Sequence, residues 1–374
     1  MTSASSTLSV IARSGNRTIR HVRQVARGNA TGLVASVYEQ MAREFAVVPP
    51  MAIHSAVPDI LAGLWCLSRE AFIVGRAERA RREMVATAVS QTNACPYCVE
   101  VHSAMLHATR NHELARKLQS EEGMTEVARA EPLIRWALAT REPQAEILAH
   151  PPFPPVEAPQ ILGTAALFHF INRMVNIFLE PLPVPRPMRF IRLKPMIGRM
   201  LGATLGKRLV GVDAAPGRSL ALLPDADLPP QFRWAEPNFA IAGALARMSA
   251  AIERQGIACL PEAAIKIVRA RVARWSGEDP GLGLQWVHES LPSRLNERER
   301  AAARLALLAA LASYRVDDET IASFRAYFPG DWQLIAAAAW GSFEAVKRLS
   351  EWLAGQPAKR SSHTEAAIAP GANG

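Results

Sequence analysis

Apolar residues recur at helical spacing along almost the whole chain, and this pattern limits the fold more than any other feature of the sequence. Runs that alternate apolar and polar residues between turn signals, which would predict half-buried strands, are missing. At 374 residues, the chain is long enough to bury the cores of two or more domains. The sequence therefore predicts a globular, all-α protein.

Two proline clusters interrupt the helical pattern. Proline lacks an amide hydrogen and disfavours helix in the residue before it, so residues 151–159 and 181–187 predict breaks. We take the second break as a domain boundary. Ahead of it, the apolar pattern predicts helices at 32–46, 59–74, 78–91, 96–109, 112–119, 125–141 and 158–179.

Composition divides the chain into five predicted segments. The first is basic and serine-rich, without the apolar run of a secretory signal, and we interpret it as a flexible arm rather than a transit peptide. The last has too few apolar residues to fold. The segments are 1–28 (arm), 29–185 (first helical domain), 186–237 (basic, proline-rich connector), 238–355 (second helical unit) and 356–374 (disordered tail).

Much of the net charge of +9 lies in the arm and between Arg186 and Arg208. Aromatic residues make up only 6% of the chain and no nucleic-acid motif accompanies the basic residues, so nucleic-acid binding is not predicted. For residues 186–208 we favour a bridging helix with a solvated face over contact with an anionic membrane surface or an acidic partner. The sequence contains no run of about 18 uncharged apolar residues, so a membrane span is not predicted.

The two halves of the chain contain a faint repeat. Residues 82–89 resemble 303–310 in pattern, and residues 165–168 resemble 337–340. The second copy has no cysteine or histidine between Arg294 and Trp340, so it cannot carry thiol chemistry. We interpret it as a degenerate repeat that completes the packing of the first.

Four cysteines do not form a disulfide framework in a chain of this length. Cys66 and Cys259 each stand alone in an apolar helical pattern and are predicted to be core residues. This use of cysteine indicates a reducing compartment, and we expect the cytoplasm. In that setting a close pair such as Cys95 and Cys98 points to redox chemistry or metal binding.

The stretch Cys95-Pro96-Tyr97-Cys98 is predicted to open a helix. Thr92-Asn93-Ala94 breaks the preceding helix and proline suits a first helical position, so Cys95 falls near the N-cap and Cys98 in the first turn. Free amide groups and the helix dipole favour a thiolate there and lower the cysteine pKa toward neutrality. His102, four residues after Cys98, shares its helical face and can take the thiol proton.

Glu83 lies at the edge of the apolar face of the preceding predicted helix. It needs a partner, because burying an unpaired carboxylate is costly. His102 is the predicted partner: the carboxylate would orient the ring and stabilise its protonated form, as the acid does in a catalytic triad. Cys98 is then the better-activated nucleophile, and Cys95 can resolve it as a disulfide.

A glutamate twelve residues before Cys-x-x-Cys, with a histidine four residues after the second cysteine, resembles the active-site signature of the alkylhydroperoxidase D branch of the carboxymuconolactone decarboxylase superfamily. The likeness covers residues 59–181. It implies an alkylhydroperoxidase D-like helical bundle and a thiol-dependent hydroperoxide reductase or related disulfide oxidoreductase. The family enzyme has a histidine between the cysteines where this chain has Tyr97, which cannot act as a base near pH 7.

The resemblance also implies a role for each site residue. Cys98 attacks a hydroperoxide substrate, Cys95 resolves the product to a disulfide, and Glu83 and His102 form the proton relay. An external dithiol, carried in family members by a dihydrolipoyl-bearing protein, then reduces the disulfide. No metal or organic cofactor is implied, and a homo-oligomer is expected.

Two other interpretations stay open. A structural zinc ion would use the same four side chains, although such sites more often take two pairs of Cys or His. A non-catalytic member of the family would act as a scaffold or interaction module through residues 186–208. Outside this motif, His169 and Arg173 are four residues apart, and we favour a pair on the helix surface over residues that line the site.

Overall fold

The fold is that of a computed structural model, in which the described residues are 19–75, 77–109, 111–181, 215–281 and 283–353. The predicted basic segment 186–208, the predicted tail and the first 18 residues of the predicted arm lie outside these ranges. The described residues form helices and one isolated antiparallel bridge, between Ile19 and Leu179. The predicted all-α class is confirmed.

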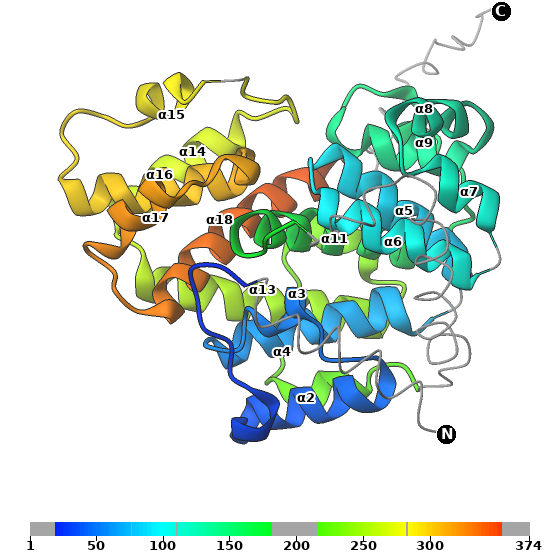
Figure 1. The fold of residues 1–374 in the computed structure, drawn as a ribbon, viewed down its shortest axis with the longest axis horizontal. Coiled ribbons are helices and arrows are strands. Elements are labelled where there is room, and N and C mark those ends of the chain that lie inside the picture. The colour runs from blue at the N-terminus through cyan, green and yellow to red at the C-terminus, as the bar shows by residue number, and fades with distance from the viewer. Residues whose placement is uncertain (1–18, 76, 110, 182–214, 282, 354–374) are drawn as a thin grey trace, which may run out of the picture.

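The helices follow one another without a strand in the described ranges (Figure 1). Proline is the first residue of α3, α4, α6 and α9 and the second residue of α11, and its fixed φ suits the first turn of a helix. The elements are α2 (Gly32–Glu44), α3 (Pro49–Ala52), α4 (Pro58–Leu67), the π-helical η2 (Ser68–Ile73), α5 (Arg79–Thr92), α6 (Pro96–Ala108), α7 (His112–Lys117), α8 (Glu121–Ala130), α9 (Pro132–Leu138), α10 (Glu146–Ala149), α11 (Ala158–Phe178), α13 (Phe239–Cys259), α14 (Glu262–Ala273), α15 (Gln285–Ser290), α16 (Glu297–Leu311), α17 (Asp318–Arg325) and α18 (Asp331–Leu353).

The prediction of one helix at 125–141 was wrong, because two helices occupy this segment. α8 ends at Ala130 and Pro132 begins α9, with Glu131 between them in extended geometry (φ −111°, ψ 98°). Proline disfavours helix in the preceding residue, and the continuous apolar periodicity on both sides hid this break. The predicted helix at 59–74 also changes type, since α4 passes into the π-helical turn η2.

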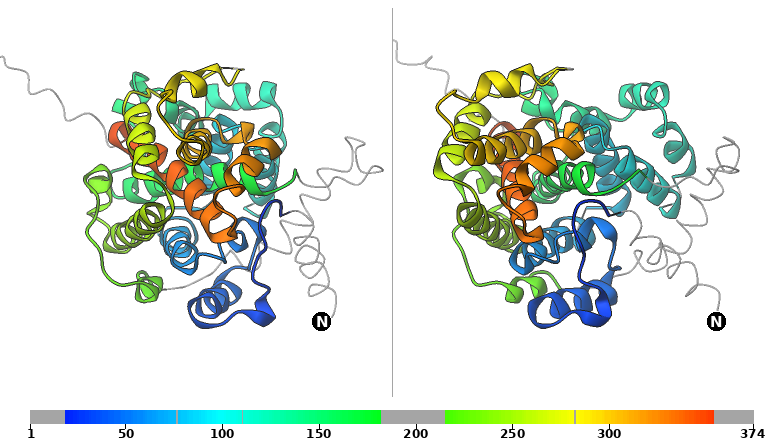
Figure 2. Two further views of the ribbon diagram at one scale, coloured as in Figure 1. Left: turned by 90° about the vertical axis from the view of Figure 1, so that its left-hand side faces the viewer. Right: turned by 60° about the vertical axis from the view of Figure 1, so that its left-hand side comes forward.

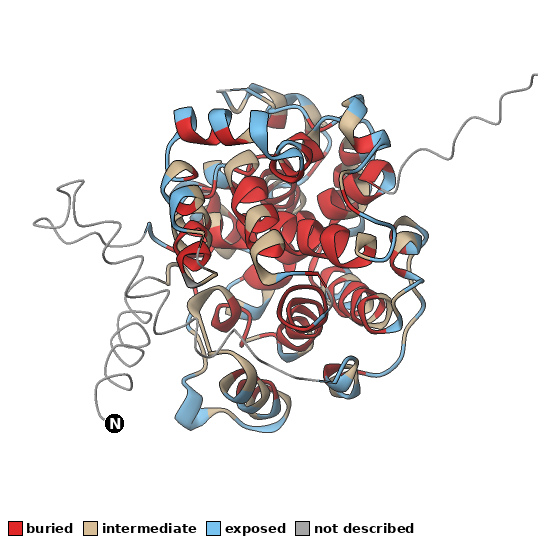
Figure 3. Cartoon of the chain, turned by 90° about the vertical axis from the view of Figure 1, so that its right-hand side faces the viewer, coloured by how far each residue is buried: buried red, intermediate tan, exposed pale blue. Residues whose placement is uncertain are grey.

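α11 and α18 lie at the centre of the fold. α11 packs on α5, η2 and α18, and α18 packs on α16 and α13. Figure 3 shows buried residues along the central helices and exposed ones at the periphery. α11 is long and apolar enough to cross a membrane, but 94% of its apolar window is buried inside the fold, which is the pattern of a core helix.

The repeated sequence patterns occupy corresponding places in the two halves. Residues 82–89 and 303–310 fall in α5 and α16, while 165–168 and 337–340 fall in α11 and α18. α5 packs on α11 as α16 packs on α18, and α11 and α18 pack on each other. Figure 2 shows these two central helices, green and orange-red, side by side. The second half therefore covers the buried side of the helix that backs the cysteine motif.

Part of the predicted arm lies on this body. The amide of Arg20 donates to the carbonyl of Phe178 (2.8 Å), and that of Val25 donates to the hydroxyl of Ser55 (2.8 Å). Val22 is buried. Residues 19–25 thus contact the end of α11 and the turn after α3.

Candidate active site

The two cysteines are held at the junction of α5 and α6. α5 ends at Thr92, and Ala94 then adopts left-handed geometry with a φ of 49°. The amide of Ala94 donates to the carbonyl of Gln91 (3.0 Å), and the amide of Cys95 donates to that of Ser90 (2.9 Å). These two bonds form the Schellman motif that closes a helix. They place Cys95 at the N-cap of α6.

Replacing Ala94 tests whether the backbone is strained at this junction. Left-handed geometry is unfavourable for a residue with a Cβ, and the side chain is exposed. We expect Ala94→Gly to raise the free energy of unfolding by about 1 kcal/mol. Urea denaturation should show a higher midpoint with an unchanged slope; a lower midpoint would mean that glycine's freedom in the unfolded chain outweighs the relief of strain.

Both cysteines lie at the start of one helix, as predicted, and both thiols are buried. Pro96 is in the first turn of α6, and Cys98 follows two residues later. Cys95 exposes 1% of its surface and Cys98 exposes 3%, and both are free thiols. The Cys95 and Cys98 sulfurs are close enough to interact. The side chains needed for an internal disulfide are therefore adjacent.

The pKa of Cys98 in the structure differs from the predicted one. Burial raises the pKa of Cys98 well above its ordinary value of 9.0, and the neighbouring Cys95 sulfur raises it further. The side chain of Asn172 acts in the opposite direction and lowers the pKa, but by less. The prediction of a near-neutral pKa was wrong for this sulfur, because the loss of water around it outweighs the field of the helix start.

Glu83 and His102 come together as predicted. Nδ1–H of His102 donates to Oε2 of Glu83 at 2.7 Å, and Glu83 exposes none of its surface. The other carboxylate oxygen, Oε1, accepts from Arg79, with distances of 2.6 Å to Nη2 and 2.8 Å to Nε. Sequence reasoning missed Arg79, although its place four residues before Glu83 is the spacing of a helical ion pair.

The charge of the Glu83 carboxylate follows from its two partners. Burial by itself would raise the pKa of Glu83, but Arg79 and His102 together hold it below its ordinary value of 4.5. Glu83 is therefore ionised at neutral pH and accepts the proton on Nδ1 of His102. That bond leaves Nε2 as the ring atom that can exchange a proton with another group.

Aromatic rings surround the imidazole of His102. Its centroid lies 5.6 Å from that of Phe72 and 4.6 Å from that of Phe168, both in edge-on geometry. Arg79 covers the face of Phe72 at 4.1 Å. In the part of the chain that the structure describes, no hydrogen bond joins His102 to either sulfur. The site thus consists of two adjacent pairs, the thiols and the Glu83–His102 pair.

Tyr97 lies beside both sulfurs. Burial raises the pKa of Tyr97, and the neighbouring charges of Cys98 and Cys95 raise it further. The phenol is therefore neutral at physiological pH. It can donate a hydrogen bond but cannot take the place of a histidine base.

His169 and Arg173 do not lie on the helix surface, so that prediction was wrong. They expose 0% and 3% of their surfaces, because the second half of the chain covers this side of α11. Burial lowers the pKa of His169 well below 6.5, which keeps its ring neutral. Nε2 of His169 lies 3.0 Å from Oγ1 of Thr140, and its Nδ1 lies 3.1 Å from Nδ2 of Asn93.

Arg173 is a buried cation that faces two helix ends. It donates to the carbonyls of His169 (2.5 Å) and Ala310 (2.9 Å) and to Oδ1 of Asn93 (3.2 Å). None of the described carboxylates forms an ion pair with it. Burial, helped by Arg141, lowers the pKa of Arg173 to about 9, so the side chain keeps its charge at pH 7. Ala310 lies near the end of α16 and Asn93 follows α5, so the cation meets the negative ends of both helix dipoles.

The other two cysteines are core residues in the structure. Cys66 donates to the carbonyl of Ser219 (3.1 Å) and Cys259 to that of Gln333 (3.3 Å). Burial raises the pKa of each to about 12. For the zinc interpretation, no group of three or more His, Cys, Asp or Glu side chains placed to hold a metal ion occurs among the described residues.

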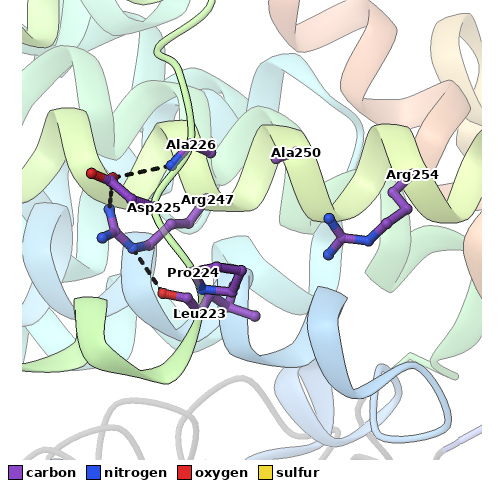
Figure 4. Close-up of a pocket in the computed structure, with 7 residues that line it drawn as sticks. All are labelled: Leu223, Pro224, Asp225, Ala226, Arg247, Ala250 and Arg254. Carbon is purple, nitrogen blue, oxygen red and sulfur yellow. Dashed lines mark hydrogen bonds and ion pairs between the residues drawn. The ribbon is translucent and has the colours of Figure 1, made fainter.

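A small cavity of about 30 Å³ lies beside α13, lined in part by Leu223, Asp225 and Arg254 (Figure 4). Arg247 spans it, with an ion pair to Asp225 (3.1 Å) and a hydrogen bond to the carbonyl of Leu223 (3.2 Å). A cavity of this size has room for little more than a water molecule. None of the predicted site residues lines it.

The comparisons with known proteins cover the site and most of the chain. The carboxymuconolactone decarboxylase family model matches residues 58–142, which include both site cysteines, Glu83 and His102. An alkyl hydroperoxide reductase of Mycobacterium tuberculosis (strain H37Rv) is 34% identical over 341 residues, or 90% of this chain and 95% of the relative. No solved structure matches the chain. The similarity thus extends through both helical halves.

Proposed function

The chain belongs to the carboxymuconolactone decarboxylase family, and on that premise we propose that it is a thiol-dependent hydroperoxide reductase. The observation that carries the proposal is the pair of adjacent free thiols at the start of α6, with His102 held by Glu83 one turn further along the same helix. The relative's name, alkyl hydroperoxide reductase, supports the same reaction class.

In the proposed reaction, the Cys98 thiolate attacks the distal oxygen of a hydroperoxide. An S–O bond forms as the O–O bond breaks, so the sulfur becomes a sulfenic acid and the peroxide is reduced to an alcohol, or to water when the substrate is hydrogen peroxide. The Cys95 thiol then attacks the sulfenic sulfur and releases water. The resulting disulfide is reset by two electrons from an external dithiol, which is itself oxidised.

His102 serves as the proton carrier in this proposal. Since no hydrogen bond joins its ring to Cys98, the proton passes through a water molecule or the incoming peroxide. Nε2 receives it, Glu83 stabilises the charged ring, and the same proton returns to the departing alkoxide. The burial that raises the pKa of Cys98 makes such a carrier necessary at neutral pH.

The burial of the thiols also constrains the reductant. Neither cysteine exposes more than 3% of its surface, so a bulky protein dithiol cannot contact the disulfide without rearrangement. A dithiol at the end of a slender arm, such as a dihydrolipoyl group, fits this site better. We place the cycle in the cytoplasm, where such reductants are kept reduced.

Counting thiols tests the proposal directly. The reduced protein is mixed with an organic hydroperoxide, quenched and titrated with a thiol reagent in denaturant. The chain has four cysteines, and we expect prompt loss of two thiols, with Cys66 and Cys259 left intact because their pKa values of about 12 keep them protonated. If all four thiols survive, the protein is not a peroxidase.

Replacing His102 tests the relay. We expect His102→Ala to raise the pH at which iodoacetamide alkylates Cys98, because the thiol loses its proton acceptor and the positive charge that acceptor would carry. Peptide mass spectrometry across a pH series measures the midpoint. His150→Ala, which removes an exposed histidine outside the site, should leave the profile unchanged. The same profile in both variants would remove His102 from the mechanism.

A further inference from the structure

The turn between α5 and α6 is held by two side chains from other parts of the first half. The carbonyls of Thr92 and Asn93 lie at the end of α5, and carbonyls at a helix end have no partner within the helix. Nη1 of Arg141 donates to the carbonyl of Thr92 at 3.0 Å, and Nδ2 of Asn176 donates to that of Asn93 at 3.1 Å. These bonds fix two successive peptide groups just ahead of Cys95.

The same two side chains are bonded to the second half of the chain. Nε and Nη2 of Arg141 donate to the carbonyls of Gly277 (2.9 Å) and Glu278 (3.1 Å), in the segment between α14 and α15. The other N–H of Asn176 donates to Oγ of Ser313, which follows α16, at 3.2 Å. Each side chain therefore connects the second half to the turn between α5 and α6.

Arg173 makes a third connection of this kind. Nη1 donates to Oδ1 of Asn93 (3.2 Å), and Nε donates to the carbonyl of Ala310 near the end of α16 (2.9 Å). A buried guanidinium is costly unless its N–H groups find acceptors, and here the turn and the second half supply them. These bonds explain why an arginine without a carboxylate partner among the described residues is buried between the two helix ends.

Gly277 shows that the second half approaches Arg141 closely. Its φ of 92° lies in the left-handed region that favours glycine, and a Cβ at this position would lie 1.7 Å from the carbonyl oxygen of Arg141. Any larger residue would push this segment away from Arg141. The bonds from the guanidinium to the segment therefore depend on glycine at this position.

Cys95 is also bonded on both of its sides. Its amide donates to the carbonyl of Ser90 (2.9 Å), and its carbonyl accepts from the amide of Val99 (3.1 Å), which is the first helical bond of α6. The two carbonyls ahead of it are held as well, so the backbone has one path from α5 into α6. This path sets the place of Cys95 relative to Cys98.

We propose that Arg141, Asn176 and Arg173 are positioning residues, through which the second half of the chain holds Cys95 beside Cys98. Two reacting groups that are held in place have a high effective concentration, so the disulfide between them forms readily. The second half, which carries no site cysteine, then tunes the redox chemistry of the first. What these residues contribute to turnover rests on the proposed peroxidase function, whereas the placement of Cys95 does not.

The test is the reduction potential of the Cys95–Cys98 disulfide, measured by counting thiols after equilibration with mixtures of reduced and oxidised glutathione. Two glutathione thiols are oxidised to one disulfide for each protein disulfide that is reduced. We expect Asn176→Ala and Arg141→Met each to favour the reduced pair about tenfold, a rise of about 30 mV. Ser313→Ala removes only the bond from Asn176 to the second half and should give a smaller rise. Potentials that do not rise in these variants, or a native protein that forms no such disulfide, would overturn the proposal.

Arg247→Met is the matched control for Arg141→Met. Nε of Arg247 donates to the carbonyls of Leu220 (3.0 Å) and Leu223 (3.2 Å), so this arginine also holds a loop (Figure 4). None of its bonds in the described chain reaches the turn between α5 and α6. The control should leave the potential unchanged; a rise equal to that of Arg141→Met would assign the effect to loosened packing and overturn the proposal. The measurement needs no peroxide, so a protein that is inert in the thiol count but shows these shifts would lose only its proposed function.

Discussion

Replacing Cys98 with serine is expected to reduce peroxide-dependent thiol loss to the background rate. A serine hydroxyl at this buried position is far less acidic than a thiol, and oxygen cannot be oxidised by a peroxide as sulfur can. Cys95 remains in this variant, so any residual reaction measures the intrinsic reactivity of the N-cap thiol. The measurement is the same thiol titration, followed over time at several peroxide concentrations.

Cys95→Ser separates attack from resolution. Cys98 should still react once, but the sulfenic acid has no adjacent thiol with which to condense. Cys66 and Cys259 are each held in the core by a hydrogen bond to a backbone carbonyl and cannot substitute for it. We expect loss of one thiol and capture of the sulfenic acid at position 98 by dimedone. If instead Cys98→Ser reacts once and Cys95→Ser is inert, the two cysteines exchange roles.

The parts of the site that sequence reasoning predicted are those set by local geometry. A proline after Cys95 and a broken helix before it are sufficient to place an N-cap, and the four-residue step to His102 fixes a shared face. The Glu83–His102 bond crosses only from α5 to α6, two helices joined by a short turn. Arg79 follows the same local rule and was available to the same reasoning.

The parts that could not be predicted depend on long-range packing. Asn172 and Arg173 come from α11, more than 70 residues after the cysteines, and α18 and the end of α16 bury that helix. The sequence alone does not show that these helices cover α11, and a histidine and an arginine four residues apart then look like a pair on the helix surface. The pKa of Cys98 also depends on packing, since its direction is set by how far the packing of α6 against α5 and α11 buries the sulfur.

Among the substitutions proposed for this protein, replacing Glu83 with alanine should lower the free energy of unfolding most. Glu83 is fully buried and neutralises Arg79, so Glu83→Ala leaves a cation and an imidazole without their acceptor. Breaking a buried ion pair in this way costs about 3–5 kcal/mol. The measurement is the free energy of unfolding from urea denaturation at pH 7. Glu39→Ala breaks an exposed pair with Arg43 at the same helical spacing and should cause no measurable change.

The pH dependence of this loss identifies the ionised carboxylate as its cause. The folded-state pKa of Glu83 lies below the ordinary value of 4.5, so its charge contributes fully above that value and the contribution fades as pH falls through the folded-state pKa. Glu83→Gln keeps the shape of the side chain without its charge. The difference in unfolding free energy between the native protein and Glu83→Gln should therefore shrink as the pH falls below about 4. A difference that persists unchanged into acid would mean that the packing of the side chain, and not its charge, holds α5 against α6.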